Sequence, residues 1–124
     1  MAQLVESAGR SFVAGAAIAQ YLRVTLSSGK LAAAGLTTRE IGVLEAASFA
    51  DLDVRSVRLR TAQGTCKMVA NAALAVGASV YTAASGKVGP SLSTGFLLGT
   101  ALSASTADGD VIEVLRSSHG DTAV

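Results

Sequence analysis

Apolar and polar side chains alternate in several short segments of this chain. In residues 21–26, Leu22, Val24 and Leu26 alternate with polar or aromatic neighbours, which is the period-two pattern of a half-buried β-strand. Comparable short segments predict further strands at 41–44, 54–61, 66–70, 80–83, 88, 95–102 and 111–115. The pattern therefore predicts an all-β fold with little helix, which we expect to be a small single-domain β-barrel or sandwich.

Glycine-containing turns separate the predicted strands. We assign structural turns to Gly29, Gly64, Gly86 and Gly109, because glycine accepts a positive φ without a steric penalty. Two Ala-rich segments, 45–52 and 68–76, also have helical propensity. We interpret 68–76 as a strand end followed by a turn, and 45–52 as a place for one helical turn.

Two short patterns recur along the chain. The segment Leu26–Leu31 (LSSGKL) resembles Ala83–Val88 (AASGKV) at a separation of 57 residues. A small or acidic turn followed by apolar residues occurs at 51–54, 76–80 and 108–111. Because the spacings are unequal, we interpret the recurrence as hairpins reused in one small β fold rather than as a solenoid.

Length and composition limit the classes of protein that fit. A chain of 124 residues supports one domain, which we place at 12–116, between an N-terminal arm at 1–11 and a flexible polar tail at 117–124. Ala, Gly, Ser and Thr make up about half of the residues and aromatic residues only 4%, so we expect partner subunits to add stability. The net charge of +1 predicts neither a nucleic-acid nor a membrane partner.

Targeting signals and reactive residues are sparse. The longest apolar run, 12–19, has eight residues against the ~20 of a membrane-spanning helix, and we expect synthesis in the cytoplasm without a signal peptide. Both Gly-Lys pairs lack the upstream glycine and the following Ser or Thr of a phosphate-binding loop. Cys66 is expected in a half-buried strand and His119 in the tail. We therefore predict no catalytic, metal or cofactor site.

Three arginines form the one basic group in a predicted strand. Arg58 and Arg60 are expected on the same strand face, with Arg55 nearby. The sequence leaves three interpretations open: a solvated face, a face that contacts another protein, and a nucleic-acid contact. The last lacks the interleaved aromatic side chains that stack on bases.

An ordered series of turn and strand motifs resembles a known family. The segments 76–81 (VGASVY), 85–88 (SGKV), 95–102 (GFLLGTAL) and 107–115 (ADGDVIEVL) together resemble the capsid cement, or decoration, proteins of tailed bacteriophages, the DUF2190 family. The resemblance extends back through 22–24, 41–44 and 64–70. The chain departs from the family pattern at Leu52-Asp53 and Gly77-Ala78, where the family often has Gly-Asp before a strand.

The resemblance implies a structural role. It implies a small β-barrel or β-tulip-like domain that forms a homotrimer at threefold and quasi-threefold positions on the outer surface of the virion capsid. There it would bind the major capsid protein and hold the shell against the pressure of packaged DNA. A small surface-displayed adhesin or carbohydrate-binding domain is the alternative, and an enzyme is not expected.

The N-terminal segment is the expected capsid-contact arm in this interpretation. It lacks period-two alternation and includes Ala2, Gln3, Leu4, Val5, Glu6 and Arg10. We expect it to become ordered on the capsid and to add a strand to a neighbouring sheet. The other possibility is an arm that packs on its own domain.

Overall fold

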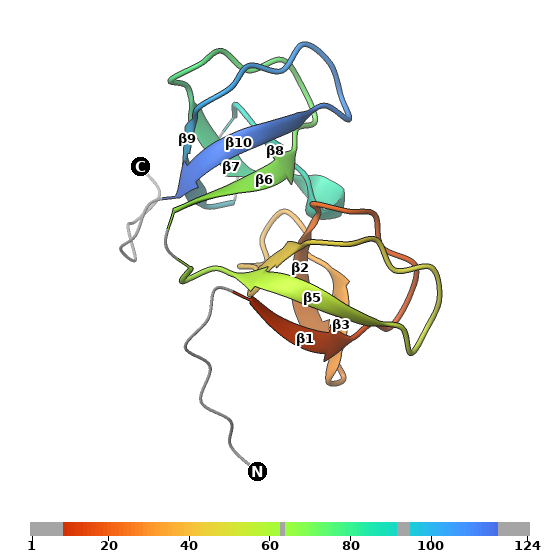
Figure 1. Ribbon diagram of the computed structural model, residues 1–124. Coiled ribbons are helices and arrows are strands. Elements are labelled where there is room, and N and C mark those ends of the chain that lie inside the picture. The colour runs from red at the N-terminus through yellow and green to blue at the C-terminus, as the bar shows by residue number, and fades with distance from the viewer. Residues whose placement is uncertain (1–8, 63, 92–94, 117–124) are drawn as a thin grey trace.

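The computed structural model describes residues 9–62, 64–91 and 95–116, and these residues form two β-sheets stacked one above the other (Figure 1). The all-β prediction is confirmed. One short 3-10 turn, η1 (Ala84–Gly86), lies between two of the strands. The strands are β1 (Gly9–Val13), β2 (Arg23–Ser27), β3 (Lys30–Ala33), β4 (Gly42–Leu44), β5 (Val54–Leu59), β6 (Thr65–Val69), β7 (Ser79–Thr82), β8 (Val88–Gly89), β9 (Leu97–Ala101) and β10 (Val111–Arg116).

The two antiparallel sheets have the same topology. Their strand orders are β1-β5-β4-β2-β3 and β6-β10-β9-β7-β8, so each strand of the first sheet has a counterpart at the same place in the second. The isolated bridges match as well: Ala14↔Leu31 corresponds to Ala70↔Val88, and Ile18↔Ser48 to Leu74↔Ser105. The chain is thus two copies of one five-stranded unit. We call residues 9–59 the first repeat and 65–116 the second repeat, with corresponding residues 56 or 57 positions apart.

This duplication bears on two expectations from the sequence. The recurring Ser-Gly-Lys turns belong to a repeat of a whole five-stranded unit, whereas we interpreted them as hairpins reused in one small β fold. The described strands form two five-stranded antiparallel sheets, and no closed barrel is detected among them. In the first repeat the edge strands β1 and β3 meet through only one bridge, Ala14↔Leu31, so the ladder does not continue around.

Each repeat has its own apolar core. Six buried positions of the first core have buried counterparts in the second, because inward-facing side chains alternate along the paired strands in both copies. Val43 of β4 packs with the second core and so joins the two repeats. The corresponding pairs are Ala14 and Ala70, Ile18 and Leu74, Val24 and Val80, Leu31 and Val88, Leu44 and Ala101, and Val57 and Val114.

A loop capped by an aspartate side chain precedes the last strand of each repeat. In the first repeat, Oδ2 of Asp53 accepts hydrogen bonds from the backbone N–H groups of Phe49 (2.8 Å) and Ala50 (3.2 Å). In the second, Oδ2 of Asp110 accepts them from Thr106 (2.8 Å) and Ala107 (3.1 Å). The segment 45–52 contains bends, a bridge and a non-helical turn at 51–52 rather than the helical turn that we expected.

The ends of the predicted segments need further corrections. Residues 68–76 do form a strand end and a turn, as predicted. The strand expected at 21–26 begins at Arg23, whose side chain is buried although the alternation with Leu22 and Val24 predicts that this position faces solvent. Gly9–Ser11, expected in the arm, pair with β5 within β1; their polar, small side chains carry no alternation signal.

No helix among the described residues is long and apolar enough to span a bilayer.

Candidate functional site

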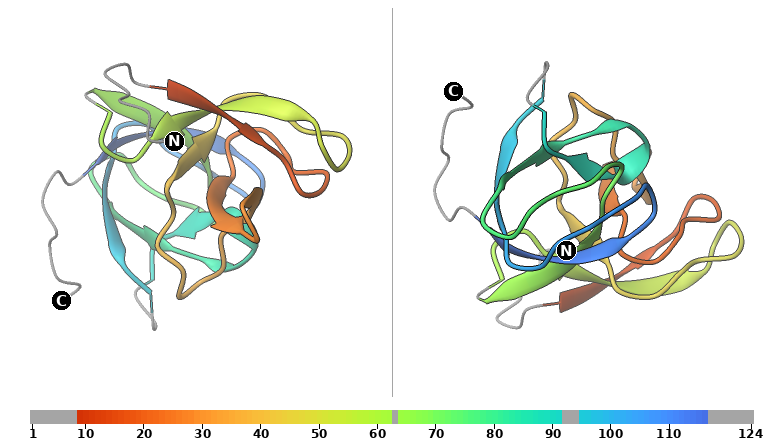
Figure 2. Two further views of the ribbon diagram at one scale, coloured as in Figure 1. Left: turned by 90° about the horizontal axis from the view of Figure 1, so that it is seen from below. Right: turned by 90° about the horizontal axis from the view of Figure 1, so that it is seen from above.

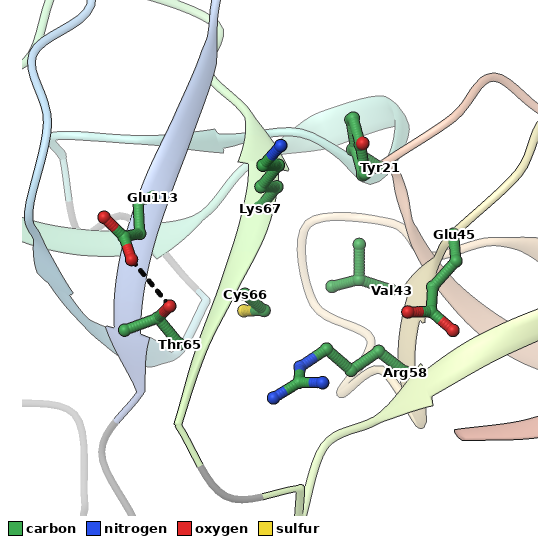
Figure 3. Close-up of a pocket in the computed structure, with 8 residues that line it drawn as sticks. All are labelled: Tyr21, Val43, Glu45, Arg58, Thr65, Cys66, Lys67 and Glu113. Atoms are coloured by element: carbon green, nitrogen blue, oxygen red, sulfur yellow. Dashed lines mark hydrogen bonds between the residues drawn. The ribbon is translucent and has the colours of Figure 1, made fainter. Parts of the chain in front are cut away.

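A cleft of about 550 Å³ lies between the two repeats (Figure 3). This volume falls within the range of sites that bind small ligands or single side chains. Both repeats contribute to the lining, so the cleft exists only because the two sheets are packed together. The lining residues are Tyr21, Val43, Glu45, Arg58, Thr65, Cys66, Lys67 and Glu113.

Charged groups of both signs surround an apolar floor in this cleft. On one side the hydroxyl of Thr65 donates to Oε2 of Glu113 at 2.7 Å. The ammonium of Lys67 lies 5.6 Å from the centroid of the Tyr21 ring, within cation–π distance. Arg58 extends across the opposite side towards Cys66, as Figure 3 shows. This arrangement can hydrogen-bond a polar ligand and stack one apolar face of it.

The thiol in the cleft is not activated. Cys66 is buried, and burial raises the pKa of its thiol, so the protonated form prevails at neutral pH. Its sulfur lies 4.0 Å from the carbonyl oxygen of Val114. No group of three or more His, Cys, Asp or Glu side chains suited to a metal occurs within the described residues.

A buried ion network joins the two repeats. Nη1 of Arg23, in β2, lies 3.4 Å from Oε1 of Glu40, and both side chains are completely buried. Nη2 of Arg116, in β10, donates to the other oxygen of Glu40. Arg23 also donates across the interface to the carbonyl oxygens of Ala83 (2.7 Å) and Lys87 (3.1 Å). Desolvation lowers the pKa of the Arg23 guanidinium, while Glu40 opposes that shift.

Exposed apolar side chains gather at one end of the first repeat. Phe49 and Leu52 lie in the loop before β5 and are 76% and 64% exposed. Val54, the first residue of β5, is also exposed and lies opposite Val13 of β1. Figure 2 shows this loop and the loop after β1 projecting together from one edge of the molecule. We call the segment 47–54 the first-repeat loop.

The three arginines that the sequence groups together lie in different surroundings in the structure. Arg55 and Arg58 lie on opposite faces of β5, since their positions differ by an odd number. Arg55 donates from Nε to the carbonyl of Ala47 and lies over the Phe49 ring at 5.9 Å. Arg58 lines the cleft, and Arg60 is exposed beyond the end of β5. The three side chains therefore do not form one continuous face.

Some of the other residues singled out from the sequence lie within the described part of the structure, and others lie outside it. Arg10 lies in β1, with its guanidinium 4.7 Å from the Phe12 ring centroid. The proposed arm residues Ala2, Gln3, Leu4, Val5 and Glu6 lie outside the described residues, as does the tail at 117–124. The turn glycines Gly29, Gly64, Gly86 and Gly109 all have positive φ.

Sequence reasoning missed the cleft, the ion network and the first-repeat loop. One signal was present: residues 47–54 (ASFADLDV) align with 104–111 (ASTADGDV), and this match extends the Ser-Gly-Lys similarity at the same spacing. Aligning the whole halves would have revealed the repeat. No protein-family model matches the chain, and no curated protein matches it significantly.

Proposed function

We propose that this protein is a capsid cement protein of a tailed bacteriophage. In this proposal it binds as a homotrimer at threefold and quasi-threefold positions on the outer surface of the head. Its partners are the major capsid protein and further copies of itself. It acts through binding alone, without catalysis or a cofactor.

The ordered motif series carries this proposal. The four segments that resemble cement proteins, 76–81, 85–88, 95–102 and 107–115, fall on β7, β8, β9 and β10 and the turns beside them. They therefore form four of the five strands of one sheet instead of being scattered matches. The first repeat has the same topology, and we propose that the pair of sheets corresponds to a β-tulip-like fold.

The mechanism proposed is multivalent clamping. Each copy offers a modest contact surface, and linking three copies makes the second and third contacts intramolecular, with a high effective concentration. A rigid body suits this role, because a flexible one would lose the advantage of simultaneous contact. The ion network and the shared core residue Val43 hold the two repeats of each copy together.

Two measurements test the proposal. Sedimentation equilibrium of the purified chain gives its oligomeric mass, alone and on dilution. Co-sedimentation with expanded, undecorated heads, assembled from the major capsid protein of the same genome, gives its occupancy. We expect saturation at one trimer per threefold position and greater resistance of the heads to heat. A folded protein that leaves such heads bare would refute the proposal.

The cleft favours a second candidate, a carbohydrate-binding domain. The cleft contains one aromatic ring near an acidic, a hydroxyl and a cationic group, and such a set can bind the hydroxyls of a sugar. These groups belong to Tyr21, Glu113, Thr65 and Lys67. Titration with a panel of saccharides, followed by NMR of the Tyr21 ring, tests this candidate. Saturable shifts that disappear in Glu113→Gln would support it, and an unchanged spectrum across the panel would exclude it.

A further inference from the structure

The second repeat serves as an internal control for the first-repeat loop. The aligned segments ASFADLDV and ASTADGDV differ at only two positions: Phe49 corresponds to Thr106, and Leu52 to Gly109. The two copies share the aspartate caps and one ion pair, whereas Arg55, which donates to the Ala47 carbonyl and lies over the Phe49 ring, corresponds to Ile112. Asp53 and Asp110 cap the backbone, and Lys30–Asp51 (3.1 Å) and Lys87–Asp108 (2.8 Å) are corresponding ion pairs.

Both differences place a large apolar side chain in solvent. Phe49 is 76% exposed and Leu52 is 64% exposed, so neither side chain contributes much to a core. The loop of the second repeat forms with threonine and glycine at these positions, which shows that its backbone does not need the larger residues. Apart from the contact of the Phe49 ring with the Arg55 guanidinium at 5.9 Å, the fold of the loop therefore does not account for Phe49 and Leu52.

Leu52 also has an unfavourable backbone conformation. Its φ is +76°, and the φ of the corresponding Gly109 is +97°. This left-handed region is open to glycine but costs free energy for a residue with a Cβ atom. An exposed leucine that strains the backbone, where the other copy has glycine, is typical of a side chain retained for contact with a partner.

The surroundings extend the apolar surface and leave it without net charge. Val54 and Val13, directly opposite each other in the β1–β5 ladder, are 58% and 37% exposed. The nearby carboxylates are paired: Asp51 with Lys30, and Asp53 with Arg55 at 3.5 Å. A partner for this surface therefore needs an apolar pocket and no strong opposite charge.

We propose that Phe49 and Leu52 are the anchor side chains by which each copy docks into an apolar pocket on a capsid shell subunit. This inference rests on the proposed cement function and assigns its contact surface. The exposed areas of Phe49, Leu52, Val54 and Val13 sum to roughly 400 Å², from side-chain areas of about 150–200 Å². A stable pair of proteins buries about 800 Å² on each partner, so this surface is too small for a lone dimer contact. It fits a pocket that recurs on a lattice, where three linked loops bind together.

The test replaces the anchors by the residues of the other repeat. Phe49→Thr/Leu52→Gly recreates a loop that already folds in this chain, so we expect no fall in the melting temperature. Val76→Gln is the matched control: it replaces an exposed valine of the second repeat by the residue at the corresponding position, Gln20. The three proteins are compared by co-sedimentation with the expanded, undecorated heads and by sedimentation equilibrium.

We expect the double variant to bind heads at least ~10-fold more weakly and Val76→Gln to bind like wild type. Wild-type binding should change little between low and high salt, because the contact carries no net charge. Equal binding by all three proteins would overturn the inference and leave the cement function intact. A double variant of altered oligomeric mass would overturn it by making the loop a subunit contact. Absence of wild-type binding would refute the cement function and this inference together.

Discussion

Replacement of Glu40 by glutamine tests the buried ion network between the repeats. Glu40 is the only carboxylate within ion-pair distance of Arg23 and Arg116 among the described residues, and the three side chains are at most 9% exposed. The positions that correspond to Arg23, Glu40 and Arg116 in the other repeat are Ser79, Leu97 and Leu59. The network therefore serves the packing of one repeat on the other, because each sheet forms without it elsewhere.

Glu40→Gln is expected to lower the free energy of unfolding, because it leaves two buried cations without their anion. Removing one partner of a buried ion pair costs about 3–5 kcal/mol. Arg23 retains carbonyl acceptors at Gly35 (3.1 Å), Ala83 (2.7 Å) and Lys87 (3.1 Å), which places Glu40→Gln near the lower end of that range. A loss of about 3 kcal/mol is a large share of the ~5–15 kcal/mol that stabilises a typical domain. It corresponds to a fall in melting temperature of about 10–15 °C for a chain of this length.

Urea denaturation followed by far-UV circular dichroism measures this loss. Glu40→Gln/Arg116→Met removes one of the two unpaired cations and should regain part of the stability lost in Glu40→Gln. Glu45→Gln is the control, since Glu45 is an exposed carboxylate that accepts a hydrogen bond from Ser56. We expect it to change the free energy of unfolding by less than about 1 kcal/mol. If Glu40→Gln changed it no more than this control does, the network would not be what holds the repeats together.

Three further changes test the backbone and the loops. Leu52→Gly should raise the free energy of unfolding, measured by urea denaturation, by about 0.5–1 kcal/mol, because glycine adopts the positive φ without strain. A lower free energy of unfolding in this variant would contradict the backbone strain at Leu52. Gly99→Ala should lower it by about 2–3 kcal/mol, since a Cβ atom there would lie 2.0 Å from the Leu115 carbonyl oxygen. Gly35→Ala, with its nearest contact at 3.7 Å, should be nearly neutral, and equal effects of the two would argue against the close approach. Hydrogen bonds from Phe49 N–H to Asp53, and from Thr106 N–H to Asp110, lower the pKa of both carboxyls below their ordinary 3.8. Their stabilising contribution is present above pH 3.8 and lost as the pH falls through the lower folded-state pKa values. Melting temperatures from pH 7 to pH 2 should therefore fall less steeply for Asp110→Asn, and parallel curves would count against the capping role.

Local patterns predicted most of the strands but not their partners. The segments expected at 41–44, 66–70, 80–83 and 111–115 coincide with β4, β6, β7 and β10 to within two residues at each end. Strand β1 was missed because Gly9, Arg10 and Ser11 give no apolar alternation. Its position depends on pairing with β5, which follows some 40 residues later in the chain.

Arg23 illustrates why burial was harder to predict than secondary structure. Alternation places an arginine next to Val24 on the outer face of a half-buried strand. In the folded chain, carbonyl oxygens of 34–38 and 83–87, together with Glu40, surround its guanidinium. These acceptors compensate for the desolvation of the guanidinium, and no local pattern in the sequence predicts them.

The amino-acid sequence by itself determined the all-β class, most strands and the positive-φ turns, because side-chain alternation and turn chemistry act between neighbours in the chain. It also contained the duplication, although only whole-length alignment of the halves makes that visible. The tertiary structure alone decided that the strands divide into two five-stranded sheets, that a cleft opens between them, and that Arg23, Glu40 and Arg116 meet. These features depend on contacts between residues far apart in sequence, whose free energy is set by packing and desolvation in three dimensions.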